Sequence, residues 1–150
     1  MSKERDLSLY CLDIFIASHL IERYTQGFEN GDELLHHRMH WDATIRQFEI
    51  IGEATGKLLK AGMVEGREFR VIVDFRNKIV HEYFGIDEEI LFDIVRRGLP
   101  RYIETMKSLV KSENLIASEA IEMELSESSH DPELLAYLET LKTDLGLTKQ

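Results

Sequence analysis

The sequence predicts an all-α fold. Apolar residues recur at spacings of three and four along most of the 150 residues, which is the period of an amphipathic helix. The chain has only two prolines, and no strand-like run is clearly closed by a hairpin turn. With 43% hydrophobic residues, the chain carries enough apolar side chains for a core. These observations argue against a β-rich fold and against wholesale disorder.

The first two expected helices span residues 5–26 and 32–60. The positions of the second helix that we expect to be buried are Leu35, Met39, Ile45, Phe48, Ile51 and Leu58. Gly52 and Gly56 lie inside this helix on one face. An interior glycine costs about 1 kcal/mol relative to alanine, so the pair indicates close contact with a neighbouring helix.

The next two expected helices span residues 67–84 and 87–111. Gly85 ends the first of them, and Asp87 is suited to cap the start of the second. Pro100 should kink the second helix or restart it, because proline lacks the N–H that a helix interior needs.

Residues 112–150 differ in composition from the rest. They hold nine acidic and two basic residues, which accounts for −7 of the net charge of −10. Residues 126–130 read as a linker, and Asp131 followed by Pro132 is a strong start signal for a short amphipathic helix over about 132–145. We therefore expect a helical bundle over residues 1–111 and an acidic extension over 112–150. The extension could fold back on the bundle, extend a dimer interface, dock a partner or simply aid solubility.

The acidity argues against a protein that coats nucleic acid by bulk charge, but it leaves room for a local basic cleft. The single cysteine, Cys11, excludes an internal disulfide and a cysteine-based zinc site, and it fits a reducing compartment. The N-terminus is charged, and no apolar stretch reaches the length of a membrane span. We expect a cytoplasmic protein with no membrane association.

The densest group of reactive side chains lies in eight residues near the end of the third helix. This segment reads Arg76-Asn77-Lys78-Ile79-Val80-His81-Glu82-Tyr83. On one continuous helix Asn77 would stack near His81, and Arg76 near Tyr83. Arg76 and His81 are five residues apart, so they diverge by about 140°. Pairing of this helix with its twin in a second chain would let Arg76 and His81 of different chains converge.

These side chains suit metal-free cleavage of RNA. Histidine can take a proton from the 2′-hydroxyl or give one to the leaving oxygen, and arginine can hold the phosphate. Two protomers would supply two histidines, enough for an acid and a base. The alternative is structural: a histidine at a helix end often caps carbonyls, and an Arg-Glu pair often lies on a solvated face.

The segment resembles the R-x4-H-x-Y signature of the HEPN ribonuclease toxins of the HepT type. Further likeness lies in residues 12–14 and 21–25, in residues 45–54, in residues 84–87 and in Leu99-Pro100, so that it covers about residues 6–111. The resemblance implies an antiparallel HEPN bundle of four to five helices and a homodimer with composite sites. It also implies a metal-independent endoribonuclease that needs no cofactor.

The resemblance assigns roles to three residues. It makes Arg76 and His81 the catalytic pair and Tyr83 the tyrosine that a cognate minimal nucleotidyltransferase antitoxin of the MntA type adenylylates. It thus implies the toxin component of a type VII toxin–antitoxin module, with RNA as substrate. Bound AMP would block the cleft by charge and bulk. The alternative for Tyr83 is a packed aromatic ring with a hydrogen-bonded hydroxyl.

Four other residues are candidates for supporting roles. Glu53 could pair with Arg76 or orient it, and Arg46 could contact RNA, the alternative being a buried ion pair. Asn77 could orient His81 or cap a neighbouring group, and Lys78 adds positive charge for RNA binding. A competing interpretation of the whole chain is a non-catalytic HEPN adaptor that binds nucleotide or holds a nucleotidyltransferase, and the trio of Arg76, His81 and Tyr83 favours the enzyme.

A second cluster contains His36, His37 and His40. His36 and His40 have the i, i+4 spacing that can bind a metal, but no carboxylate falls in a recognised pattern with them. We expect no metal site here. Trp41 beside them is expected in the core or at an interface.

Overall fold

The computed structural model describes residues 6–147, and all regular structure in that range is helical. The elements in chain order are α1 (Leu7–Thr25), α2 (Gly31–His36), α3 (Arg38–Lys60), α4 (Arg67–His81), the 3-10 turn η1 (Tyr83–Gly85), α5 (Glu88–Asp93), the π-helical turn η2 (Ile94–Gly98), α6 (Leu99–Glu113), α7 (Ser118–Glu127) and α8 (Pro132–Asp144). The predicted all-α class is confirmed. No helix in the described range is both long enough and apolar enough to span a bilayer.

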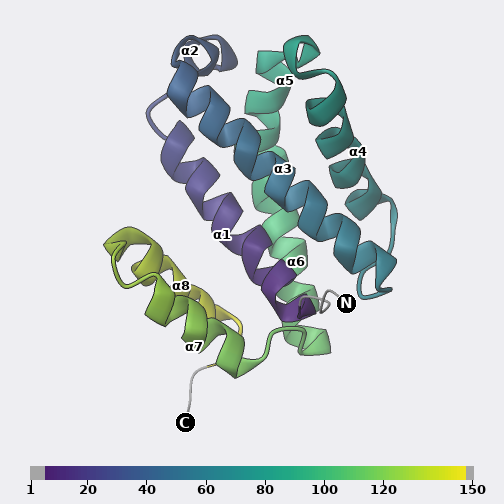
Figure 1. The fold of residues 1–150 in the computed structure, drawn as a ribbon, viewed down its shortest axis with the longest axis vertical. Coiled ribbons are helices and arrows are strands. Elements are labelled where there is room, and N and C mark those ends of the chain that lie inside the picture. Colours follow the sequence, from purple (N-terminus) through teal and green to yellow (C-terminus); the bar gives the residue numbers. More distant parts are fainter. Residues whose placement is uncertain (1–5, 148–150) are drawn as a thin grey trace, which may run out of the picture.

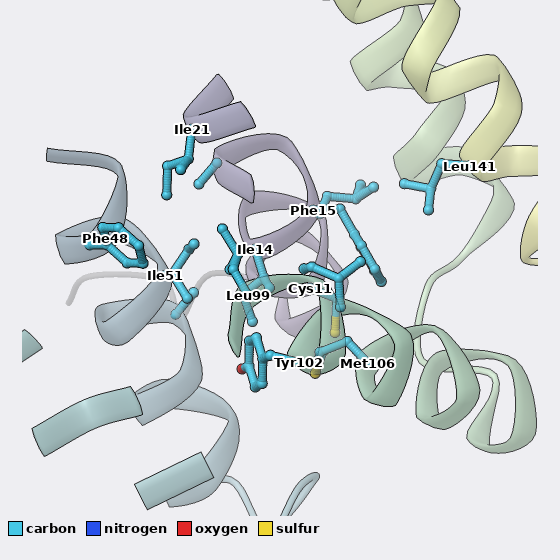
Figure 2. Close-up of a cluster of buried hydrophobic side chains, with 14 of the residues drawn as sticks. Cys11, Ile14, Phe15, Ile21, Phe48, Ile51, Leu99, Tyr102, Met106 and Leu141 are labelled. Atoms are coloured by element: carbon cyan, nitrogen blue, oxygen red, sulfur yellow. The ribbon is translucent and has the colours of Figure 1, made fainter. Parts of the chain in front are cut away.

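The bundle is built around α1 and α3, which run antiparallel and pack along their length (Figure 1). Helix α4 packs on α3, and α6 lies behind α1 and α3. The core lies where α1, α3 and α6 meet (Figure 2), and its labelled side chains there are Cys11, Ile14, Phe15, Ile21, Phe48, Ile51, Leu99, Tyr102 and Met106. This arrangement leaves the outer face of α4 without a helix over it.

The expected helix over residues 32–60 is two helices, which is the first correction. The chain breaks at His37, whose backbone lies outside the helical region at φ −100° and ψ 81°. The rings of His36 and His37 each donate from Nδ1 to a backbone carbonyl four residues earlier, of Asp32 and Glu33. Both carbonyls belong to the first turn of α2, so the two rings fold back along this short helix. Met39 follows the break and is 84% exposed, so its expected burial was wrong.

The third expected helix ends earlier than predicted. Helix α4 stops at His81, Glu82 leaves the helical region, and Tyr83 begins η1. The fourth expected helix contains α5, η2 and α6 in succession, with Pro100 in the first turn of α6. Pro100 therefore restarts an α-helix after a π-helical turn, one of the two outcomes that the sequence predicted.

The C-terminal residues form a helical hairpin, α7–α8, that folds back on α1 (Figure 1). Asp131 caps α8 through a hydrogen bond from the backbone N–H of Leu134, as the sequence predicted. Helix α7 was not expected, and its last two residues, 126 and 127, fall in the expected linker. The apolar side chains that the hairpin buries are Ile121, Leu125, Leu138, Leu141 and Leu145. The extension therefore folds back on the bundle, which is one of the alternatives that the sequence left open.

Candidate functional site

Arg76 lies on the face of α4 that packs against α3. Its side-chain stem passes directly over Gly52, where an added Cβ would overlap the Cβ of Arg76. One turn later, a Cβ on Gly56 would lie 3.8 Å from Val73 Cγ2, which is an ordinary contact. The expected close helix contact is therefore present, and it is tightest where the arginine leaves the backbone.

The guanidinium of Arg76 is incompletely paired. Its Nη1 donates to Asn77 Oδ1 at 3.1 Å, while its Nε is buried and has no hydrogen-bond partner in the described part of the chain. A buried donor left unpaired costs about 1–3 kcal/mol. Asn77 thus contacts the neighbouring Arg76, and within residues 6–147 it forms no hydrogen bond with His81. No ion pair joins Glu53 to Arg76 within residues 6–147, so the role that the sequence left open for Glu53 is not visible in one chain.

His81 is the last residue of α4 and is exposed to solvent. It borders an open depression of about 410 Å³ that is lined by Asn77, Lys78, His81 and Glu82. The depression therefore combines an amide, an ammonium and an imidazole, which are groups that can bind and protonate a phosphodiester.

Within one chain, Arg76 and His81 do not meet. Arg76 is half-buried against α3, whereas His81 is exposed beside the outward depression. This matches the divergence of about 140° that five residues of helix impose.

Tyr83 lies apart from Arg76, because α4 ends before it. The expectation that these two stack on one continuous helix was therefore wrong. The ring of Tyr83 is half-buried, packs edge-on against Phe84 at 5.2 Å, and its hydroxyl donates to Asp42 Oδ1 on α3. Burial, followed by the hydrogen bond and charge of Asp42, raises the pKa of Tyr83. The phenol is thus protonated at neutral pH.

The remaining candidates lie on the surface. Arg46 forms an ion pair with Glu49 at 3.2 Å on α3 itself, so it is not the buried structural pair that the sequence left open. Glu53 and Lys78 are exposed. The chain alone does not join Arg46 or Glu53 to Arg76.

The histidines near residue 37 serve the fold. His37 and His40 pack around the ring of Phe28, with centroid distances of 4.8 and 5.3 Å. Within residues 6–147, no group of three or more His, Cys, Asp or Glu side chains is placed to hold a metal ion. Trp41 is 2% exposed, which confirms that it belongs to the core.

Asp42 is the residue near the site that the sequence did not single out. It lies 41 residues before its partner Tyr83 and belongs to no motif. An exposed aspartate near the start of a helix is common, and no local pattern in the sequence distinguishes this one. Tertiary packing of η1 on α3 brings the two together.

Comparison with known proteins places the chain in a ribonuclease family. The family model "Ribonuclease HepT-like" matches residues 14–109, which include all of α3, α4 and η1. No solved structure matches the chain.

Several relatives carry ribonuclease names. The chain is 33% identical over 110 residues to "Putative RNase MJ0127" of Methanocaldococcus jannaschii, which covers 72% of this chain and 90% of that protein. It is 33% identical over 93 residues to "Probable ribonuclease HepT" of Thermococcus cleftensis, which covers 61% and 84%.

The third relative is longer. The chain is 29% identical over 119 residues to "Gamma-glutamylcyclotransferase and putative RNase MJ0434" of M. jannaschii, covering 73% of this chain and 52% of that protein. It therefore spans about half the length of this relative. The family match covers well over half of the chain, and its relatives are named as ribonucleases, the enzyme class that the sequence predicts. The chain belongs to the ribonuclease HepT-like family.

Proposed function

We propose that this protein is a metal-independent endoribonuclease toxin whose active site is built by two copies of the chain. The observation that carries the proposal is the divergence of Arg76 and His81. The helix turns by about 140° over the five residues from Arg76 to His81, and a second copy would supply the group that one chain directs elsewhere. The outer face of α4 suits this pairing, because it bears the exposed Lys78 and His81, and the neighbouring Val80 is 47% exposed.

The chemistry follows from the side chains. Arg76 binds the scissile phosphate and stabilises the charge that develops on its oxygens. One His81 takes the proton of the 2′-hydroxyl as its oxygen bonds to phosphorus. His81 of the partner subunit gives a proton to the 5′ oxygen as the P–O bond breaks. Asn77 supports Arg76 through its amide, and Lys78 adds positive charge for the RNA backbone.

The direct test measures RNA cleavage by Arg76→Ala and His81→Ala, in the presence of a chelator. We expect each variant to lose at least about 10³-fold in rate while keeping its unfolding temperature, since both act on the transition state. His130→Ala is the matched control, because His130 is an exposed histidine next to α8 and outside the site. Equal cleavage by His81→Ala would contradict the assignment and favour the non-catalytic adaptor. Activity that a chelator removes and a divalent ion restores would contradict the metal-free mechanism.

The shared site has its own test. Wild type is co-refolded with a growing excess of the double variant Arg76→Ala/His81→Ala, and cleavage is measured per wild-type chain. If both copies build the site, a tenfold excess of inactive chains lowers that rate about tenfold, because nearly every wild-type chain then pairs with an inactive one. A rate per wild-type chain that stays constant would show that each chain carries a complete site.

We further propose that a minimal nucleotidyltransferase of the MntA type silences the toxin by adenylylating Tyr83, as in a type VII module. Tyr83 is two residues from His81, so an attached AMP would put a phosphate and a base beside the RNA site. Mass spectrometry after co-expression with a cognate transferase of the MntA type should find AMP on the peptide that contains Tyr83. AMP on another residue would contradict the assignment of Tyr83 as the modified tyrosine.

A further inference from the structure

The hydroxyl of Tyr83 is held in one direction before any partner arrives. It donates to Asp42 Oδ1, so a carboxylate from α3 already accepts the proton that the phenol carries. Packing fixes the ring as well, because Tyr83 is half-buried and stands edge-on to Phe84. The Trp41 side chain also hydrogen-bonds the tyrosine, so Asp42 and Trp41, both on α3, together fix the direction of the hydroxyl.

The surroundings make a base necessary. Burial and the neighbouring Asp42 raise the pKa of Tyr83, while Arg38, at the start of α3, lowers it by a smaller amount. Trp41 also contacts the tyrosine and lowers its pKa. A phenol with a raised pKa is a poor nucleophile at neutral pH unless its proton leaves during attack. Arg38 lies one helical turn before Asp42, which places a cation and a carboxylate on the same face of α3.

We propose that Asp42 is the general base for nucleotidyl transfer to Tyr83, so that the target chain itself supplies this group to the transferase. In the step, the phenolic oxygen bonds to the α-phosphorus of ATP held by the transferase. The bond from that phosphorus to the pyrophosphate oxygen breaks, and pyrophosphate leaves. The phenolic proton passes to the Asp42 carboxylate, while Arg38 faces the entering phosphate. This inference rests on the proposed modification of Tyr83.

The experiment compares initial rates of AMP transfer to full-length wild type, Asp42→Asn and Asp42→Glu by the purified cognate transferase with MgATP. Asparagine keeps the shape and a hydrogen-bond acceptor but removes the base, so we expect the rate to fall about 10²-fold or more. Glutamate should restore part of the rate. Asp93→Asn is the control, since Asp93 is an exposed aspartate on α5 that pairs with Arg97. Circular dichroism and unfolding temperature check that each variant is folded.

A pH series separates a base from a mere docking contact. In Asp42→Asn the phenol must ionise by itself, so the deficit relative to wild type should shrink about tenfold per pH unit as pH rises toward the pKa of tyrosine. A deficit that is constant across pH would reduce Asp42 to a structural contact and overturn the inference. So would equal rates for wild type and Asp42→Asn. If wild type itself takes up no AMP on Tyr83, the proposed silencing fails, and the inference fails with it.

Discussion

The charged side chains on two sides of the bundle differ in how they are paired. On the side of α1 and α6, the α7–α8 hairpin pairs its charges: Arg23 binds Asp131 at 2.8 Å and Glu133 at 2.9 Å. On the side of α4, neither Lys78 nor His81 forms an ion pair in the described part of the chain, and the Nε of Arg76 lacks a partner. Figure 1 shows that these two sides are well separated.

The apolar groups follow the same division. The hairpin buries its leucines, and Leu138 is fully buried. Around the motif, Val80 is 47% exposed and Phe84 is 96% exposed. The hairpin side thus pairs Arg23 within the chain and buries most of its leucines, although the buried Nε2 of His19 there has no hydrogen-bond partner in the described residues. The α4 side leaves Lys78, His81, Val80 and Phe84 available to a second copy, an RNA or a partner protein. We therefore expect substitutions in the α7–α8 hairpin to alter stability and substitutions around Arg76, His81 and Tyr83 to alter activity.

The largest effect on stability is expected from Leu138→Ala. Truncating this fully buried leucine should lower the free energy of unfolding by about 2–5 kcal/mol, through lost burial and the cavity left behind. Chemical denaturation measures the loss, and Thr140→Ala on the exposed face of α8 is the control. RNA cleavage per folded molecule should remain unchanged. A large loss of cleavage in the folded variant would break the division between the two sides.

The next effect is expected from Gly52→Ala. The added methyl overlaps the stem of Arg76, so the arginine or α4 must shift, and a displacement of about 1 Å at a catalytic group costs on the order of 10–100-fold in rate. Gly56→Ala is the matched control, because its methyl makes an ordinary contact and gains about 0.5–1 kcal/mol from helix propensity. Equal rates for the two variants would mean that the Arg76 stem has no role in cleavage.

The smallest effect concerns the dependence of stability on pH. The ring of His19 stacks on Tyr137 at 4.4 Å, and burial, followed by the charge of Arg23, lowers the pKa of His19. The folded state thus favours the neutral ring, so the unfolded chain binds more protons as pH falls below the ordinary histidine pKa. Wild type should lose a few degrees of unfolding temperature between about pH 7.5 and pH 5 for this reason.

His19→Phe keeps an aromatic ring on Tyr137 and removes the titration. The fall in unfolding temperature over that pH range should therefore be smaller in the variant than in wild type, as measured by calorimetry. An identical fall in both proteins would show that His19 contributes nothing to the pH dependence.

Local signals in the sequence predicted local features well. Asp131 caps α8, Pro100 lies in the first turn of α6, and Gly52 marks a close helix contact. Each of these follows from the backbone chemistry of one residue and its near neighbours. The position of Arg76 on a buried face and of His81 on an exposed one also follows from the helical period.

Features that depend on distant groups were not predictable in this way. The helix breaks at His37, although the spacing of four between Leu35 and Met39 is typical of one continuous helix. The bond between Tyr83 and Asp42 joins residues 41 positions apart. Helix α7 has no side-chain cap at Ala117, and packing against α1 stabilises it. The sequence of this segment contains no local signal for that packing.

The contact between Gly52 and the stem of Arg76 has a consequence for the entropy of binding. A long flexible side chain loses about 1.5–2 kcal/mol of rotamer freedom when it is fixed. Here folding has already fixed the first bonds of Arg76 against α3, while its guanidinium still has an unpaired donor. Much of this side-chain entropy is therefore lost when the chain folds. Binding of a phosphate to Arg76 should then cost little further side-chain entropy.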